Sequence, residues 1–321
     1  CAYFDVNRYY VDTLDGMVID EFLEVIYEEY SDRLEDVDWA ELAGFFTDEP
    51  QVSRNGIPWS FIYEESYREH YGEDLLPLLP HLFFAEGNYQ QTRYRFWRLT
   101  TILFMENFMK KIYDWCEEYG CKITGHHVCE ESYRSQLTSN GAVMPNYQYY
   151  HIPGMDWLGR RINPVTTPVQ VASVCAQTGK KQIMSETFAM CGWNVKFEDL
   201  KWMFQWQMVH GINLLCQHLE SYSLKGIRKR DYPASLFLHQ PWWKDYRLFN
   251  DYVTRIGVLL SEGEVAVDTL ILHGQSTAWL CYDNSDNTKL DDYFEKFLSL
   301  SNLIDSAHVN FHYGDETMID M

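Results

Sequence analysis

The chain has 321 residues, of which 46% are hydrophobic, and this is enough for one large domain or two ordinary ones with a substantial core. Its 47 acidic residues outnumber 26 Lys and Arg, and the formal net charge of −21 argues against nucleic acid and anionic membranes as partners. Aromatic residues make up 16%, which fits either a large aromatic core or the stacking surfaces of a sugar site.

In chain order, the predicted elements alternate between helix and strand. Apolar residues at helical spacing predict a helix over residues 18–34 with Asp15 as its N-cap, and residues 44–47 predict a buried strand that ends at Asp48 and Glu49. The elements expected after this point are short helices around 64–71, helix 94–119, strand 122–128, a short strand 143–147, helix 168–178, strand 182–185, helix 197–210, strand 212–216, helix 242–260, strand 268–272 and helix 290–305.

This alternation is typical of an α/β fold with a parallel sheet. Both (β/α)8 barrels and doubly wound sheets place active sites at the carboxyl ends of their strands. Because only four or five strands are predicted before residue 260, the first strands of such a barrel are expected to precede Cys1, so that the barrel is incomplete in this chain. A Gly-Glu break near residue 263 predicts a catalytic barrel portion at 1–262 and the start of a second α/β domain at 263–321.

The eight cysteines form no CxxC pair and lie mostly in apolar runs, which predicts buried free thiols in a reducing compartment. No apolar run reaches the roughly 18 residues that span a bilayer, and no signal-peptide pattern is present. We therefore expect a cytoplasmic protein. The sequence opens in mid-pattern without Met, as expected for a piece of a longer protein.

Carboxylates follow several predicted strands, in TDEP, GHHVCEES, SETF and QHLES. Acetal cleavage requires one protonated carboxyl, which delivers a proton to the leaving oxygen, and one ionised carboxylate. Glu49 and Glu186 are the candidates for this pair. Asp48 is either functional or the N-cap of a helix at a βα turn. Glu130 and its neighbour are either functional or the acidic first turn of a helix.

The histidines at strand ends fit either zinc or sugar hydroxyls. Adjacent strand residues face opposite sides, so His126 and His127 cannot readily bind one ion, and sugar binding is favoured. Trp193, just after Glu186, is a candidate sugar platform, as is Trp59, whereas Trp202, Phe204 and Trp206 are expected mostly in the core. No metal ligand is assigned. The residues expected to hold or shape the substrate are Asp48, His126, His127, Glu130, His151, Asp156, Trp157, Trp193, His218, Glu220, Tyr222 and Trp242.

The motifs FTDEPQ, YDWCEEYG, KITGHHVCEE, YYHIPGMDWLGR, SETFAMCGW, LKWMFQWQMVHGINLLCQHLESYSLKGIRKRDYP and QPWWKDY occur in this order over about residues 8–260. The order resembles bacterial glycoside hydrolases similar to family 106, the α-L-rhamnosidase-like group. The resemblance implies a (β/α)8-type barrel with Glu49 and Glu186 as the two carboxylates. It also implies inversion of configuration, a calcium ion near the site for which no ligands are matched, and a following flavodoxin-like or amidotransferase-like domain that begins at DTLILHGQSTAW. Similar barrels occur as dimers or trimers, so a homo-oligomer is compatible with this reading.

The sequence therefore predicts a glycosidase that removes a terminal sugar from a glycan. By analogy with barrels whose fourth strand carries the proton donor, Glu49 is the general acid. Glu186 is the nucleophile if configuration is retained, or the general base if it is inverted. Two alternatives stay open. One is a carbohydrate-binding barrel that has lost turnover, and the other, less favoured, is a metal-dependent hydrolase that uses His126 or His127 with His218.

Overall fold

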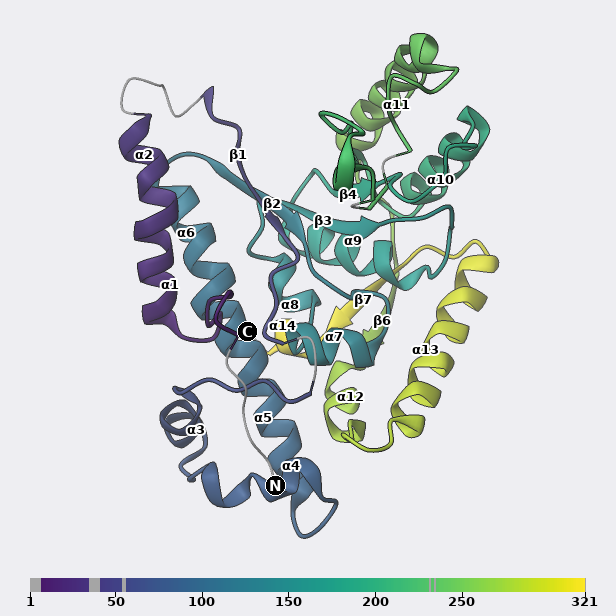
Figure 1. The fold of residues 1–321 in the computed structure, drawn as a ribbon. Helices are drawn as coiled ribbons and strands as arrows, with labels where there is room; N and C mark the ends of the chain where they lie inside the picture. Colours follow the sequence, from purple (N-terminus) through teal and green to yellow (C-terminus); the bar gives the residue numbers. More distant parts are fainter. Residues whose placement is uncertain (1–6, 35–40, 54–55, 231, 234, 321) are drawn as a thin grey trace. The chain divides into compact units, whose positions relative to one another are not determined.

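The computed structural model describes residues 7–34, 41–53, 56–230, 232–233 and 235–320 (Figure 1). The chain splits into two compact units. The first contains residues 1–151, 272–297 and 314–321, and the second contains residues 152–271 and 298–313. The domain boundary predicted near residue 263 stays a prediction. Among the described residues, no helix is both long and apolar enough to cross a membrane.

In the first unit, two parallel strands carry the acidic pair of the TDEP motif. Gly44–Asp48 (β1) pairs with Lys122–His126 (β2), and Asp48 lies in register with His126. Gly125 makes this pairing possible. Its φ is +146°, and a Cβ at this position would lie 2.0 Å from the carbonyl oxygen of Thr47. Only glycine accepts such an approach, so this residue fixes how closely the two strand ends meet.

Two long helical segments accompany these strands. The helix predicted over 18–34 is confirmed as consecutive turns: Gly16–Phe22 (α1), a π-helical turn at Leu23–Glu28 (η1) and Glu29–Arg33 (α2). Asp15 caps it as predicted, because its carboxylate accepts a hydrogen bond from the N–H of Met17 at 2.9 Å.

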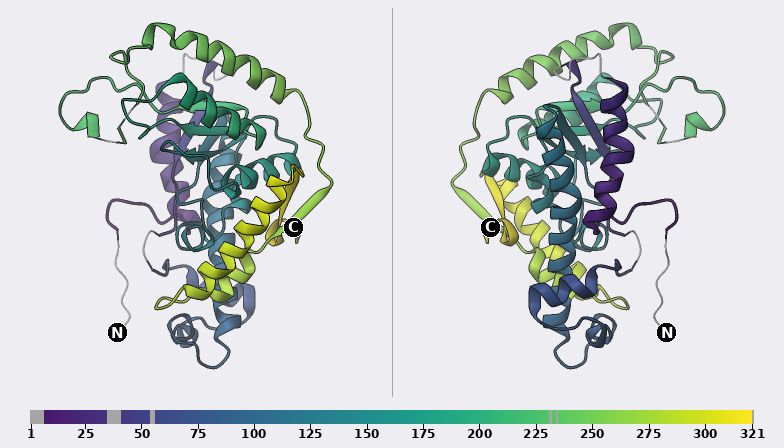
Figure 2. Two further views of the ribbon diagram at one scale, coloured as in Figure 1. Left: turned by 90° about the vertical axis from the view of Figure 1, so that its right-hand side faces the viewer. Right: turned by 90° about the vertical axis from the view of Figure 1, so that its left-hand side faces the viewer.

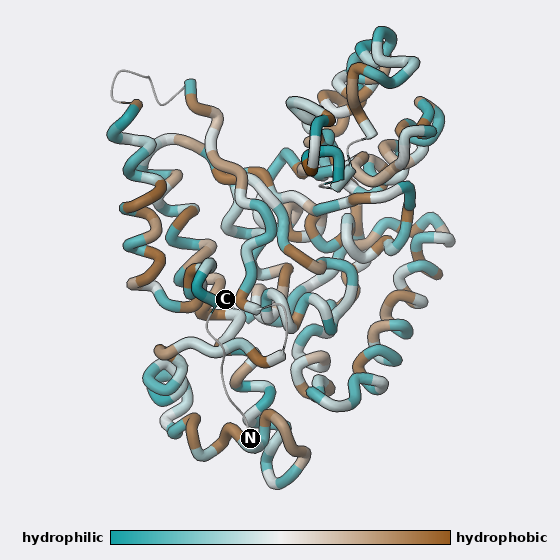
Figure 3. The backbone as a smooth tube through the Cα atoms, viewed as in Figure 1, coloured by the Kyte–Doolittle hydropathy of each residue, from teal (hydrophilic) through white to brown (hydrophobic). Residues whose placement is uncertain are grey.

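The helix predicted over 94–119 is also confirmed and begins earlier. It consists of Tyr89–Phe104 (α5), Met105–Lys110 (η4) and Lys111–Glu118 (α6), which Figure 2 shows as one continuous rod. In the hydropathy colouring, brown residues recur between teal ones along α1 and α6, as expected for helices that bury one stripe (Figure 3).

The expected strand at residues 143–147 is wrong, because Met144–Tyr147 (α8) forms a short helix. Pro145 stands in its first turn, where the missing N–H costs no hydrogen bond. The remaining elements with all residues in the first unit are Tyr63–Tyr71 (α3), Leu76–Leu78 (η3), Pro80–Phe83 (α4), Tyr133–Asn140 (α7), Gln275–Cys281 (α12) and Glu316–Ile319 (α14).

The second unit is built on three parallel strands. Met184–Thr187 (β4) lies between Ile152–Trp157 (β3) and Leu214–Gln217 (β5). No strand was predicted at β3. The helices of this unit are Thr166–Thr178 (α9), Phe197–Val209 (α10), Gly226–Arg230 (η5), Trp243–Asp245 (η6) and Tyr246–Ser261 (α11).

Three elements have residues in both units by this division. Thr269–His273 (β6) and Phe311–Asp315 (β7) form a two-stranded sheet, and Thr288–Ser306 (α13) lies between them in the chain. The strand predicted at 268–272 and the helix predicted at 290–305 are thus confirmed within one or two residues.

The seven described cysteines carry free thiols. The predicted burial is confirmed for Cys116, Cys121, Cys175 and Cys191, and desolvation raises the pKa of each of these thiols. It is wrong for Cys129, which is exposed in the turn after β2. Cys216 and Cys281 are half-buried.

Candidate functional site

The carboxyl ends of β1 and β2 bring an acid and an imidazole together in the first unit. Asp48 Oδ1 lies 3.7 Å from His126 Nε2, and the Asp48 side chain is 76% exposed while His126 is buried. The alternative that Asp48 caps a helix is wrong, because in the described chain the next helix begins only at Tyr63. Asp48 is instead the last residue of β1, at an edge where a ligand could reach it.

Glu49 leaves β1 in an unusual backbone conformation. It is half-buried, and its φ of +54° places a non-glycine residue in the left-handed region. This conformation costs an L-residue roughly 1–2 kcal/mol, and such residues concentrate at functional sites. Glu49 is therefore where the chain turns away from the strand, with its carboxylate at the strand's carboxyl end.

His127 and Glu130 belong to a buried network in the first unit. The side chain of Glu130 accepts hydrogen bonds from the N–H of His127 at 3.1 Å and from the hydroxyl of Tyr147 at 2.7 Å. Burial, helped by the charge of His126, lowers the pKa of His127 to about 3. Neither side chain is exposed beyond 2%, so their expected contact with sugar hydroxyls is not possible in this conformation. The helix that follows is capped by Ser132, so Glu130 is not part of its first turn either.

His151 lies at the other end of β2. Its Nδ1 accepts a hydrogen bond from the N–H of Ile123 at 3.0 Å, and its ring stacks on Tyr113 with centroids 4.4 Å apart. Nε2 is 2.6 Å from a carboxylate oxygen of Glu117. The expectation that His151 shapes the substrate pocket is therefore corrected: these contacts hold the amino end of the strand, away from Asp48.

In the second unit, the alternation of β4 directs Glu186 to one face. Ser185 and Thr187, on either side of it, are buried, and Thr187 Oγ1 accepts a hydrogen bond from Gln207 of α10 at 3.1 Å. Successive strand residues point to opposite faces, so Glu186 faces away from α10. Its side chain keeps 15% exposure. A carboxylate at this depth is largely removed from bulk water but still reachable.

Two polar residues flank Glu186 in the sheet. Asp156 of β3 is its register partner and so lies on the same face. His218 follows β5, and its N–H extends the ladder by donating to the carbonyl of Thr187 at 2.8 Å. His218 Nε2 comes within 3.6 Å of Glu186 Oε1. Burial and the charge of Glu186 also raise the pKa of the thiol of Cys216.

Trp157 was expected to shape the pocket, and the structure corrects this. It is in register with Thr187, is fully buried and stacks on Trp206 of α10 with ring centroids 5.0 Å apart. Its Nε1–H donates to the carbonyl of Arg161 at 3.1 Å. The ring therefore supports the sheet from the face opposite to Glu186.

The other predicted residues of the second unit lie in loops beyond the strands. Trp193 is 48% exposed in the loop after Glu186, and Glu220 and Tyr222 are exposed after β5, with Tyr222 at 98%. Trp242 is half-buried, and its Nε1–H donates to the carbonyl of Val195 at 2.9 Å. Trp202, expected mostly in the core, is instead 45% exposed on α10.

The calcium ion implied by the resemblance finds no ligand set in either unit taken by itself. Ca²⁺ takes six to eight oxygen ligands. Within each unit, the described His, Cys, Asp and Glu residues bring no three ligand atoms together. We therefore assign no residues to the ion and derive no chemical step through a metal.

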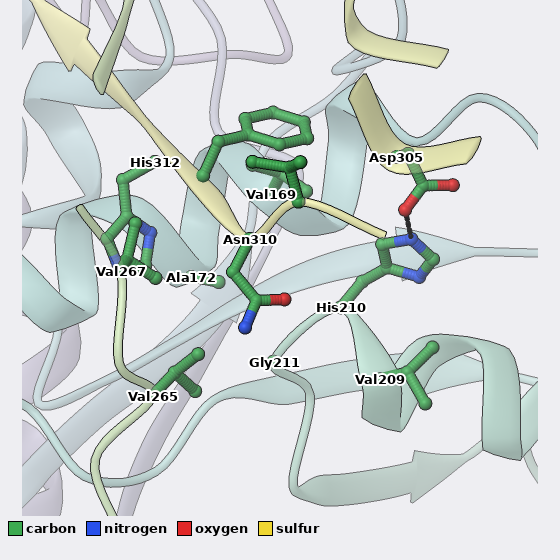
Figure 4. Close-up of a pocket in the computed structure, with 12 residues that line it drawn as sticks. Val169, Ala172, Val209, His210, Gly211, Val265, Val267, Asp305, Asn310 and His312 are labelled. Carbon is green, nitrogen blue, oxygen red and sulfur yellow. Dashed lines mark hydrogen bonds and ion pairs between the residues drawn. The ribbon is translucent and has the colours of Figure 1, made fainter. Parts of the chain in front are cut away.

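A small cavity of about 70 Å³ lies elsewhere in the second unit (Figure 4). Valine and alanine side chains line it together with His210, whose Nε2 is 3.1 Å from Asp305 Oδ1. Ligand pockets usually enclose about 300–1,000 Å³, so this cavity has no room for a sugar ring. This cavity therefore does not replace the strand ends around Glu186 and Glu49 as the candidate sites.

Comparisons with known proteins identify the fold. No family model and no curated protein matches the chain. The structure of the rhamnosidase from Novosphingobium sp. PP1Y aligns with a TM-score of 0.61 and 21% identity, over 82% of this chain and 26% of that one. Gan42B, a GH42 β-galactosidase from G. stearothermophilus, aligns with a TM-score of 0.59 and 12% identity, over 98% of this chain and 51% of that one.

At these identities the likeness shows the fold alone. The chain is an α/β protein with parallel strands that resembles part of the TIM barrel of glycosidase structures. It spans about a quarter of the rhamnosidase and about half of the galactosidase. The predicted α/β class is thus confirmed. The (β/α)8 architecture, expected to be incomplete in this chain, and the flavodoxin-like or amidotransferase-like second domain stay predictions.

Proposed function

We propose that this protein is a glycoside hydrolase that removes a terminal sugar from a glycan, with Glu49 and Glu186 as its acid/base pair. The observation that carries the proposal is the position of Glu186: a mostly buried carboxylate at the carboxyl end of a parallel strand, 3.6 Å from an imidazole nitrogen. Parallel β/α barrels keep their chemistry at this end of the strands. The similarity to a rhamnosidase and a β-galactosidase supports the same class of reaction.

In this proposal, Glu49 is protonated and donates its proton to the oxygen of the leaving group as the glycosidic bond breaks. Its left-handed backbone holds the carboxyl at the end of β1. Glu186 is ionised, and it either attacks the anomeric carbon or removes a proton from the attacking water. The ring of His218, with Nε2 3.6 Å from Glu186 Oε1, helps to hold this carboxylate in place. Asp156, exposed Trp193 and Asp48 are then available to bind the sugar.

The test is a pair of isosteric substitutions, Glu49→Gln and Glu186→Gln, assayed on a panel of nitrophenyl glycosides. Each should lower kcat by about a thousandfold or more, because an amide neither ionises nor delivers a proton. Glu65→Gln in the first unit and Glu264→Gln in the second are matched controls, since both residues are exposed. Near-normal turnover by either test variant would end the assignment of that residue.

A carbohydrate-binding protein without turnover would give a different result. It would bind sugars by calorimetry but hydrolyse none of the panel, and the Gln substitutions would leave its affinity nearly unchanged.

A further inference from the structure

A cluster of positive charge follows β5 in this otherwise acidic chain. The basic segment, Lys225–Arg230, holds four cations in six residues, whereas the whole chain has 26 Lys and Arg and a net charge of −21. All four of these side chains, Lys225, Arg228, Lys229 and Arg230, are exposed.

The cations of the basic segment make no ion pair with the described part of the chain. Other cations of the second unit do: Arg160 lies 2.5 Å from Asp199, and Arg247 lies 3.8 Å from Asp251. Asp231, the next residue, is outside the described chain, and Glu220 is the nearest preceding acid. By sequence, the four cations less Asp231 leave three positive charges over residues 225–231. At 0.1 M salt, charges are screened beyond about 10 Å, so an anion near the segment senses this local excess more than the acids farther along the chain.

The loop that carries this segment is fastened to the residues just after Glu186. At its start, the N–H of His218 donates to the carbonyl of Thr187 at 2.8 Å. At its end, the carbonyl of Pro233 accepts a hydrogen bond from the N–H of Met190 at 2.9 Å. Lys225 is seven residues beyond His218, so the chain limits their separation to about 25 Å. The basic segment therefore belongs to the same edge as Glu186, within a few sugar units of it.

Exposed apolar side chains accompany the charges. Tyr222 is 98% exposed, Ile227 80% and Tyr232 54%. These three side chains belong to the same loop as the cations and are open to a ligand. Aromatic rings stack on the C–H faces of sugars, while Lys and Arg pair with carboxylate or sulfate oxygens. One short loop thus offers both contacts that an acidic sugar needs.

We propose that the basic segment binds the anionic groups of the glycan, either uronic acid carboxylates or sulfate esters, on sugar units next to the one that is cleaved. This rests on the proposed hydrolase function for the identity of the cleaved bond, but the binding itself does not require turnover. Nucleic acid is the less favoured ligand, because the rest of the chain repels a phosphate backbone.

The experiment compares the triple variant Arg228→Gln, Lys229→Gln, Arg230→Gln with a charge-matched control, Lys181→Gln, Arg255→Gln, Lys289→Gln, whose residues are also exposed. Binding is measured by calorimetry at low and high salt. The probes are an oligogalacturonate, its carboxyl-reduced form, a sulfated galactan, its desulfated form and a DNA duplex. Hydrolysis of a neutral nitrophenyl glycoside is assayed in parallel.

The triple variant should bind one of the two anionic glycans about tenfold more weakly than the unmodified protein, as expected for the loss of three exposed ion contacts, and the control should change little. Reduction of the galacturonate carboxyls or desulfation of the galactan should weaken binding to the unmodified protein to a similar extent. Which of the two treatments has this effect shows which anion is recognised. Hydrolysis of the neutral glycoside should be unchanged in both variants. Three outcomes would each overturn the proposal. The triple variant could bind the anionic glycans as tightly as the control variant does, the neutral glycans could bind as tightly as the anionic ones, or DNA could bind more tightly than either. If no glycoside were hydrolysed but the binding differences were still observed, the hydrolase function would be rejected and the anion site would be supported.

Discussion

His218 Nε2 lies 3.6 Å from Glu186 Oε1, with both side chains about 15% exposed. The contact joins the end of β4 to the residue that follows β5, and the hydrogen bond from the His218 N–H to Thr187 fixes the backbone beside it. His218 is thus placed to hold the Glu186 carboxylate in one orientation.

We predict that His218→Gln lowers kcat by about tenfold while KM and the midpoint of urea unfolding change little, because the Glu186 carboxylate loses the ring that holds it in one orientation. The measurements are kcat, KM and urea unfolding. His308→Asn, which changes an exposed histidine of the same unit, should leave all three unchanged. A loss of stability with no separate loss of kcat would mean that His218 only supports the fold.

The role of Glu49 can be separated from that of Glu186 through the leaving group. A dinitrophenolate departs without a proton, whereas a sugar or alkyl alcohol needs one. Glu49→Gln should therefore slow a dinitrophenyl glycoside far less than an alkyl glycoside, by a factor of about a hundred or more. Glu186→Gln should slow both equally in the bond-breaking step. The same penalty for both substrates in Glu49→Gln would exclude Glu49 as the general acid.

Trp193 should contribute to substrate affinity. Its side chain is 48% exposed beside the loop that follows Glu186, so Trp193→Ala is expected to raise KM about fivefold to tenfold, the effect of one lost stacking contact, with little change in stability. Trp202→Ala is the matched control, because Trp202 is 45% exposed in the same unit but lies on helix α10. Equal KM values in the two variants would remove Trp193 from the binding surface.

Gly125→Ala should destabilise the first unit by about 3 kcal/mol or more, because the new Cβ would meet the Thr47 carbonyl oxygen at 2.0 Å in a backbone region that L-residues avoid. Gly72→Ala is the control: its φ is +70°, but no atom lies within 4 Å, so only the conformational cost of about 1–2 kcal/mol remains. Urea unfolding measures both. Similar losses of unfolding free energy in Gly125→Ala and Gly72→Ala would show that β1 and β2 can move apart at little cost.

Asp315 should make stability depend on pH. Burial raises the pKa of its carboxyl to about 7, above the ordinary value of 3.8, while burial lowers the pKa of the adjacent His273 to about 3. The folded state thus prefers protonated Asp315. The contribution of this carboxyl to the free energy of unfolding is fully present below about pH 4 and is lost as the pH rises through 7. The loss is at most about 4 kcal/mol.

Asp315→Asn should remove this dependence, because the amide oxygen can still accept the hydrogen bond from the N–H of Thr317. Urea unfolding at pH 5 and pH 8 should therefore show a smaller difference for the variant than for the unmodified protein. Glu264→Gln, at an exposed acid, should behave like the unmodified protein. An unchanged difference in Asp315→Asn would show that the carboxyl is ionised in the folded state.

Local sequence signals were sufficient for most elements. Helix periodicity and the Asp15 cap predicted α1 to α2, α5 to α6, α9 and α10 to within about five residues, because these signals act over one or two turns. Runs of apolar residues before polar ones also located β1, β4 and β5. The polar residues at those strand ends, Glu49, Glu186 and His218, were therefore visible before any fold was known.

The tertiary structure determined which residues share a face of the sheet, and the pattern of neighbours along the chain did not predict this. The run IPGMDW contains a proline and a glycine, both poor in strands, yet it pairs beside β4 and places Asp156 in register with Glu186. His127 and Trp157 resembled their neighbours as candidate site residues, but strand alternation directs Trp157 into the core and His127, just after β2, is fully buried. Nothing in the local sequence connects the basic segment with Glu186; the hydrogen bonds at both ends of its loop, to Thr187 and Met190, do so. Composition and short-range periodicity specify which residues are able to react; which of them share a face depends on strand register, and register is set by contacts between segments far apart in the chain.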